Sequence, residues 1–179
     1  LPSKVSDNEF KKIIAVLRLS VPYTGIILST RENAELRKEL CHLGVSQVSA
    51  GSRTMPGSYS SKDKSNAQFT VSDNRSLSEV VSDLAASGFI PSFCTSCYRT
   101  GRTGEDFMDL AKPGDIKNYC QPNAILTFEE YLLDYDPELA QRVKPHILSE
   151  VSRIPDHKIR EATLGKMESL IQGKRDQFF

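Results

Sequence analysis

Three of the four cysteines in this 179-residue sequence occur as Cys94-Thr-Ser-Cys97 followed by Cys120, with 22 residues between the last two. Two thiolates spaced Cys-x-x-Cys can bind one metal ion or one edge of a cluster, and a third thiolate from a loop can complete the site. Structural zinc normally takes four protein ligands, whereas three thiolates suit an iron–sulfur cluster with one open iron. The spacing by itself leaves iron and zinc as equal alternatives.

Other interpretations of these cysteines remain open. The three can be reduced structural thiols, or zinc ligands completed by a histidine. His146 and His157 lie far along the chain, so neither is an obvious fourth ligand. Arg99 and Arg102 can pair with a cluster or substrate charge, or they can be solvated loop residues. Cys41 falls on an apolar helix face, where we predict a core thiol.

Arg31 and Ser29 are candidate substrate-binding residues. They stand at and just beyond the end of the apolar run 24–29, which is typical of a buried parallel strand. In a TIM-type barrel the carboxyl ends of the strands face the active site, and a guanidinium there can bind a substrate carboxylate through two hydrogen bonds. The alternative is a surface arginine paired with Glu35 along a helix. The residues by themselves favour this alternative.

The first part of the chain has the pattern of an α/β fold. The signals are a capping box at residues 6–9, a strand at 24–29, a helix from 30–33 to Gly44 and a strand at 45–50. Helix, strand, helix, strand is the order of an α/β barrel or a doubly wound sheet. Two strands cannot close a barrel, so residues 1–52 are predicted to be the last part of one.

The rest of the chain is predicted to be a polar loop and a helical domain. The loop covers residues 53–75, with an extended piece at 68–71, and the mostly α-helical C-terminal domain covers residues 76–179. Helices are expected after the capping box at 76–79, over 105–111, from a cap at 127–130, from Pro137, and in a last helix that ends near Gly173.

Composition excludes several classes of protein. Lysine plus arginine and aspartate plus glutamate are 23 each, so the formal charge is zero. A general nucleic-acid or membrane-surface role needs a basic excess and is not expected. No apolar run approaches membrane-spanning length, and four cysteines do not form a secreted disulfide framework. A reducing, intracellular setting fits this pattern. The first residue, Leu1, indicates part of a longer protein or a processed product.

Several stretches together resemble the HydG family of radical S-adenosylmethionine tyrosine lyases, which mature FeFe-hydrogenases. The matching stretches are residues 17–32, 44–51, the block from Cys94 to 124, 127–132 and 173–176. They extend over almost the whole chain, which resembles the C-terminal part of that family. The most specific element is the cysteine spacing, because the related thiamine-pathway tyrosine lyase lacks this second cluster site.

The resemblance implies terminal strand–helix units of a TIM-type barrel followed by a helical C-terminal domain. That domain holds an auxiliary 4Fe-4S cluster through Cys94, Cys97 and Cys120, together with an additional iron, and Arg31 and Ser29 bind tyrosine. The family cleaves tyrosine into p-cresol and dehydroglycine. Dehydroglycine then yields the carbon monoxide and cyanide ligands for assembly of the hydrogenase active site.

The sequence departs from the family in one respect. It contains no Cys-x-x-x-Cys-x-x-Cys, the motif that binds the radical cluster. S-adenosylmethionine and a second 4Fe-4S cluster are therefore expected in a missing N-terminal part, which is the first expected partner, and this chain by itself is expected to be inactive. Hydrogenase maturation scaffold proteins are further expected partners, in the cytoplasm or in a eukaryotic organelle. The alternative function is a non-catalytic zinc-binding interaction module.

Overall fold

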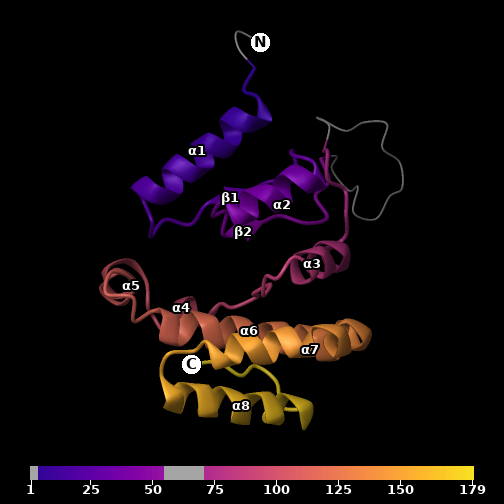
Figure 1. Ribbon diagram of the computed structural model, residues 1–179. Coiled ribbons are helices and arrows are strands. Elements are labelled where there is room, and N and C mark those ends of the chain that lie inside the picture. Colours follow the sequence, from indigo (N-terminus) through magenta and orange to yellow (C-terminus); the bar gives the residue numbers. More distant parts are fainter. Residues whose placement is uncertain (1–3, 55–70) are drawn as a thin grey trace. The chain divides into compact units, whose positions relative to one another are not determined.

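The computed structural model describes residues 4–54 and 71–179. The chain divides into two compact units, Leu1–Val81 and Ser82–Phe179, and each is described by itself. The described elements are mostly helices, and they include one small parallel sheet (Figure 1). Within the described ranges, no helix is both long enough and apolar enough to cross a membrane.

The first unit alternates helices with short strands. Its elements are α1 (Asp7–Ser20), β1 (Ile27–Leu28), α2 (Ala34–His42) and β2 (Gln47–Val48). The predicted capping box at the start of α1 is confirmed, because Glu9 N–H donates to the Ser6 hydroxyl and the Glu9 carboxylate accepts from Ser6 N–H. β1 and β2 pair in parallel, with Ile27 opposite Gln47. The predicted alternation of helix and strand is therefore present, with strands shorter than expected.

A small apolar core holds this unit together. Its buried members come from α1, β1, α2 and the segment between α2 and β2, and they are Ile14, Leu28, Leu36, Leu40 and Val45. The partly buried Cys41 packs against them, as a core thiol should. The expectation of a fully buried first strand is wrong for Ile27, whose residue is 70% exposed. β1 therefore buries one face in this chain and presents the other to solvent.

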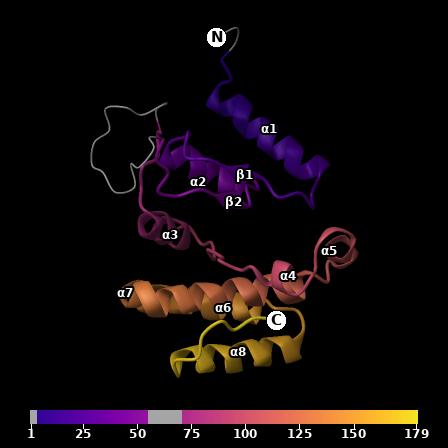
Figure 2. The same cartoon turned by 180° about the vertical axis from the view of Figure 1, so that it is seen from behind.

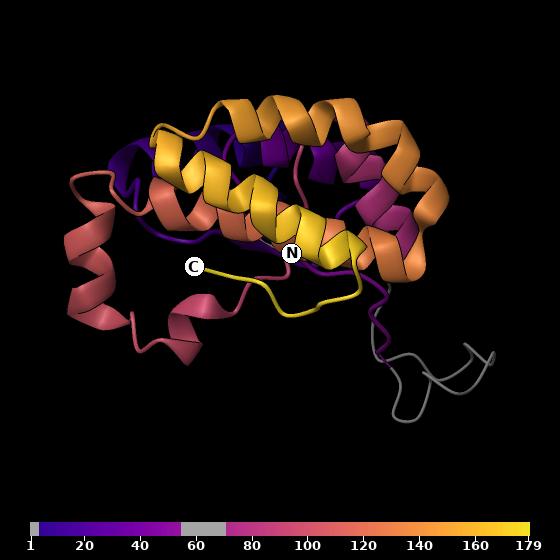
Figure 3. The ribbon, with the colours of Figure 1, turned by 90° about the horizontal axis from the view of Figure 1, so that it is seen from below.

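The second unit is helical. The unit boundary falls within α3 (Leu77–Ala86), and the following helices are α4 (Ser96–Arg99), α5 (Gly104–Ala111), α6 (Lys117–Tyr135), α7 (Pro137–Ser152) and α8 (His157–Ile171). α6, α7 and α8 pack against one another (Figures 1 and 3). Their shared core contains fully buried side chains, among them Ile125, Phe128, Leu132, Ile147 and Leu170.

One predicted helix start is wrong. The chain was expected to begin a helix at the cap in residues 127–130, but α6 already begins at Lys117. The Thr127 hydroxyl donates to the carbonyl of Asn123, 2.9 Å away, so it bonds back into a helix instead of capping one. Pro122 costs α6 a backbone hydrogen bond. The helix face from Pro122 to Leu132 is buried, and this packing keeps the chain helical beyond Pro122.

The other fold predictions concern the remaining helices, the polar loop and the barrel. The capping box at Ser76 and Glu79, the helix α5 and the start of α7 at Pro137 are confirmed. Most of the predicted loop, and residues 68–70 of its extended piece, lie outside the described residues. The small parallel sheet with its helices agrees with an α/β first part, and its place in a TIM-type barrel stays a prediction.

Candidate functional site

The second unit contains all three candidate cluster cysteines. Cys94 lies just before α4, Cys97 lies within α4, and Cys120 lies in the first turn of α6. The third thiol is therefore supplied by a helix, whereas the sequence predicted a loop. Cys94 and Cys97 are half-buried and Cys120 is exposed, and none of them forms a disulfide. The Ser96 N–H points to the Cys94 sulfur at 3.4 Å, which fixes the turn that leads into α4.

Neighbouring groups influence the Cys120 thiol. Although the residue is exposed, partial desolvation of the thiol raises its pKa, and electrostatic interactions with Cys97 and Cys94 raise this pKa further. Arg102 acts in the opposite direction and lowers the same pKa. Its guanidinium lies 4.5 Å from the centre of the Tyr119 ring. Three thiols and the guanidinium of Arg102 thus lie in the same region of the chain. A positively charged metal group bound there would stabilise the thiolate form of these cysteines.

In the described part of the chain, the three thiols do not converge on one point. Among residues 4–54 and 71–179, no group of three or more His, Cys, Asp or Glu side chains is placed to hold a single metal ion. Cysteines of an iron–sulfur cluster bind different irons, so their sulfurs need not converge on one point. Of the two histidines weighed as fourth ligands, His157 pairs with Glu161 at 3.9 Å, and the buried Nε2 of His146 has no hydrogen-bond partner in the described structure.

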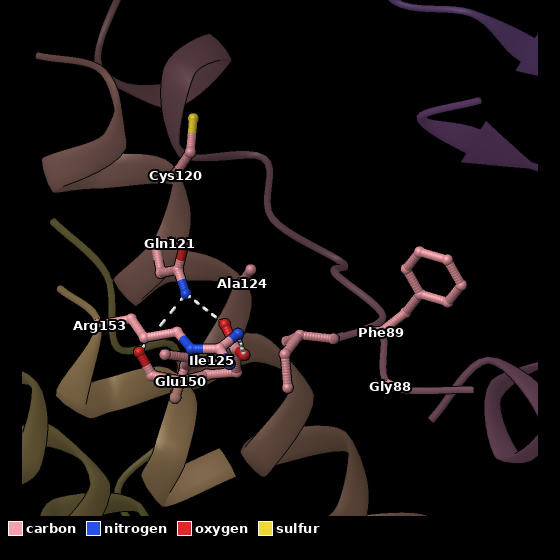
Figure 4. A pocket seen from close by; sticks show the side chains of 9 residues that line it. Gly88, Phe89, Cys120, Gln121, Ala124, Ile125, Glu150 and Arg153 are labelled. Atoms are coloured by element: carbon pink, nitrogen blue, oxygen red, sulfur yellow. Dashed lines mark hydrogen bonds and ion pairs between the residues drawn. The ribbon is translucent and has the colours of Figure 1, made fainter. Parts of the chain in front are cut away.

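A cavity of about 420 Å³ borders Cys120. Phe89 and Gln121 are among its lining residues, and Gln121 Nε2 donates to the Glu150 carboxylate at 2.7 Å (Figure 4). Glu150 also pairs with Arg153 at 2.5 Å. The polar groups of this cavity therefore satisfy one another, while the Cys120 sulfur points away from them (Figure 4).

The candidate substrate residues lie in the first unit, between β1 and α2. Ser29 and Arg31 are both exposed, on either side of the buried Thr30. The Thr30 carbonyl accepts hydrogen bonds from the N–H groups of Ser72 at 3.1 Å and Asp73 at 3.0 Å. The backbone that carries Ser29 and Arg31 is thus fixed by the segment around Asp73.

A buried ion-pair network supports this segment, and sequence reasoning missed it. Arg37 of α2 and Asp73 are each 3% exposed; Arg37 donates to the Asp73 carboxylate and to the Ser49 carbonyl beyond β2. Arg75 binds the same carboxylate at 2.9 and 2.8 Å. Hydrogen bonds from Arg75, with help from the charge of Arg37, lower the pKa of Asp73 to about 2. The network joins α2, the end of β2 and the segment that holds Thr30.

Comparison with known proteins finds several that match about half of the chain. The family model of the Biotin and Thiamin Synthesis associated domain matches residues 1–90. Two 2-iminoacetate synthases, from Salmonella typhimurium and Escherichia coli, are 35% and 33% identical over 91 residues, which are 50% of this chain and 24% of each relative. The chain therefore spans about a quarter of the length of these curated relatives.

The crystal structure of HydG, a maturase of the [FeFe]-hydrogenase, matches all of this chain. The TM-score is 0.91 and the identity 46%, over 100% of this chain and 39% of that one. This similarity confirms the resemblance to HydG predicted from the sequence. Since its family model covers half of the sequence, the chain belongs to the Biotin and Thiamin Synthesis associated domain family.

Proposed function

We propose that this chain is the auxiliary-cluster portion of a radical S-adenosylmethionine tyrosine lyase that makes carbon monoxide and cyanide for FeFe-hydrogenase assembly. The observation that carries the proposal is the whole-length similarity to HydG combined with three free cysteines at α4 and α6 of the second unit. The family model ends at residue 90, before Cys94, so it does not account for these cysteines. The HydG similarity extends over them.

The residues of the chain have separate roles in this proposal. Cys94, Cys97 and Cys120 hold an auxiliary 4Fe-4S cluster, which supplies an open iron and an attachment point for an additional iron when it is bound. Arg31 pairs with the carboxylate of tyrosine, and Ser29 donates a further hydrogen bond to it. The first unit forms the last strand–helix units of a TIM-type barrel, whose strand ends face the substrate.

The rest of the enzyme lies outside this chain in the proposal. An N-terminal part carries the radical 4Fe-4S cluster, S-adenosylmethionine and the other barrel strands, and it generates p-cresol as the by-product of tyrosine cleavage. The product ligands pass to hydrogenase maturation scaffold proteins, in the cytoplasm or in an organelle of a eukaryote. Neither nucleic acid nor a membrane is a proposed partner.

Anaerobic reconstitution of the 179-residue chain with iron and sulfide tests this proposal. Iron and acid-labile sulfide, measured per chain, should approach the content of one 4Fe-4S cluster, and a variant with all three cysteines changed to serine should contain neither. Stoichiometric zinc without sulfide, together with folding that depends on zinc, would instead support the zinc-binding interaction module.

A further inference from the structure

The segment that follows α8 runs back from the end of that helix (Figures 2 and 3). Its residue Phe179 makes backbone hydrogen bonds in the second unit. Phe179 N–H donates to Asn123 Oδ1 at 2.8 Å, and its carbonyl accepts from the Ser96 hydroxyl at 2.7 Å, Arg102 at 2.7 Å and Asn123 Nδ2 at 3.3 Å. One backbone unit thus binds side chains from three places in the sequence.

Two of these side chains, Ser96 and Asn123, belong to α4 and α6 and lie close in sequence to the cysteines. Ser96 lies between Cys94 and Cys97 at the start of α4, and Asn123 lies one turn after Cys120 on α6. Ser96 is 2% exposed and Asn123 1% exposed. Buried polar groups need hydrogen-bond partners, and Phe179 satisfies both ends of the Asn123 amide. Phe179 also accepts from the Ser96 hydroxyl, whose oxygen accepts from Arg102 at 2.8 Å. It therefore fixes α4 against the first turns of α6.

A second attachment secures the same segment to α4. Arg99 donates to the Asp176 carboxylate with both terminal nitrogens, one of them at 2.8 Å, and its guanidinium lies 4.4 Å from the centre of the Phe178 ring. Asp176 N–H donates to the Glu130 carboxylate of α6 at 2.7 Å. Asp176 has a φ of 62°, a left-handed conformation that aspartate tolerates better than most residues. The segment 176–179 is thus bonded to both α4 and α6.

We propose that residues 176–179 are a positioning strap, which holds α4, with Cys97 in it and Cys94 just before it, at the correct distance from Cys120 on α6 for cluster assembly. The inference rests on the proposed function, because it assigns the strap to the cluster site. It predicts that residues which touch no metal control how well the metal group is held, as partners behind metal ligands commonly do.

Two variants of the 179-residue chain test the strap. One deletes residues 176–179, and the other is Asp176→Asn, which removes the charge that Arg99 binds. The matched control is Asp134→Asn, because Asp134 forms a similar exposed pair with Arg175 in the same tail, but it lies at the opposite end of α6 from Cys120 and outside residues 176–179. A charge swap, Arg99→Asp with Asp176→Arg, tests whether a restored pair rescues the site.

The measurements follow both the metal and the protein. In reconstituted chains, the deletion should weaken iron retention about tenfold in a chelator challenge, as loss of outer partners does. It should also change the electron paramagnetic resonance spectrum of the reduced cluster. Asp176→Asn should change both readouts in the same direction, Asp134→Asn should match the wild type, and the charge swap should recover retention. In metal-free chains, amide hydrogen exchange of residues 95–100 should be faster in the deletion, while the far-ultraviolet circular dichroism of the helices is kept.

The outcomes separate the strap from the proposed function. If the wild type assembles a cluster and the deletion retains iron equally well, the strap is wrong and the cluster assignment stands. If the wild type assembles no cluster, the proposed function fails, and with it the strap's role in cluster assembly. Hydrogen exchange in metal-free chains then still decides whether residues 176–179 order α4.

Discussion

The proposed chemistry has two steps, tyrosine cleavage and the formation of carbon monoxide, and only the second uses the cluster cysteines. Changing these cysteines to serine should therefore stop the second step and leave the first. In an enzyme that joins this chain to its N-terminal part, Cys94→Ser with Cys97→Ser replaces soft ligands by hard ones and should abolish the auxiliary cluster. Arg31 and the rest of the first unit are not altered. We expect p-cresol to form at a rate close to that of the wild type, while carbon monoxide falls to background.

The measurement is p-cresol by chromatography and carbon monoxide by binding to deoxyhaemoglobin, with iron per chain determined on the same samples. A Cys41→Ser variant is the control, because Cys41 packs against the core of the first unit. If p-cresol disappears together with carbon monoxide in a folded protein, the two steps do not divide in this way.

Arg31 offers the complementary prediction. In the same joined enzyme, Arg31→Ala should raise the KM for tyrosine about tenfold or more, the loss expected for a charge-assisted hydrogen bond to a carboxylate. Iron per chain should not change. Arg142→Ala, at an exposed position of α7, is the control. Loss of iron with an unaltered KM would show that Arg31 is structural.

At the scale of residues, sequence reasoning found groups with distinctive chemistry and missed groups whose meaning depends on distant partners. The spacing of Cys94 and Cys97 is visible in a few letters. Asn123 has no distinctive feature in the sequence, because its hydrogen-bond partner Phe179 lies 56 positions further along the chain. Arg37 likewise looks like a solvated charge on an amphipathic helix, because its partner Asp73 lies beyond a long polar segment.

The elements of the first unit depend on the Arg37–Asp73 pair. Arg37→Met leaves a carboxylate buried with fewer partners, and we expect a loss on the order of 3 kcal/mol in the free energy of unfolding. Lys11→Met is the control, since Lys11 pairs with Glu39 at a partly exposed site and should contribute less than about 1 kcal/mol. Urea unfolding at pH 7 measures both. Equal stability of the two variants would contradict the assigned role of the pair.

The same network predicts a pH dependence of stability. The pKa of Asp73 is about 2 in the folded chain, against an ordinary value of 3.8. A carboxylate with a depressed folded pKa stabilises the fold above its unfolded pKa, and this stabilisation is lost as the pH falls through the folded value. The wild type should therefore lose stability between about pH 4 and pH 2. Asp73→Asn should lose less in this window, which urea unfolding in a pH series can measure.

Capping and turn residues predicted where most helices begin, whereas the start of α6 depends on tertiary packing. Capping boxes at Ser6 and Ser76 mark real helix starts, because they are satisfied within four residues. The start of α6 could not be read in this way. Pro122 and Thr127 both argue locally for a later start, but the helix is continued by burial against α7 and α8. The predicted lengths of the two strands were too great, because an apolar run indicates burial but not how many residues form a hydrogen-bonded ladder.

At the scale of the whole molecule, the first unit has apolar side chains that its own core does not cover. Ile27 of β1 is 70% exposed, and Leu19 of α1 is 83% exposed. In the proposed enzyme, other strands and helices of the barrel cover such side chains. The number of strands in the sequence indicated an incomplete barrel. It could not indicate which apolar side chains stay exposed, because this depends on which face of β1 and of α1 packs against the core.

Ile27 gives a test of this incomplete surface. Because the side chain is mostly exposed in this chain, Ile27→Asp should change the free energy of unfolding by no more than about 0.5 kcal/mol. In complementation with a separately produced N-terminal part, the same change places a charge in an apolar interface and should abolish association. Ile171→Asp is the matched control, since Ile171 of α8 is 63% exposed and lies in the second unit. Association is measured by calorimetric titration, and p-cresol formation in the mixture gives a second readout. If Ile27→Asp binds the N-terminal part as tightly as the wild type does, this part does not cover the face of β1 that carries Ile27.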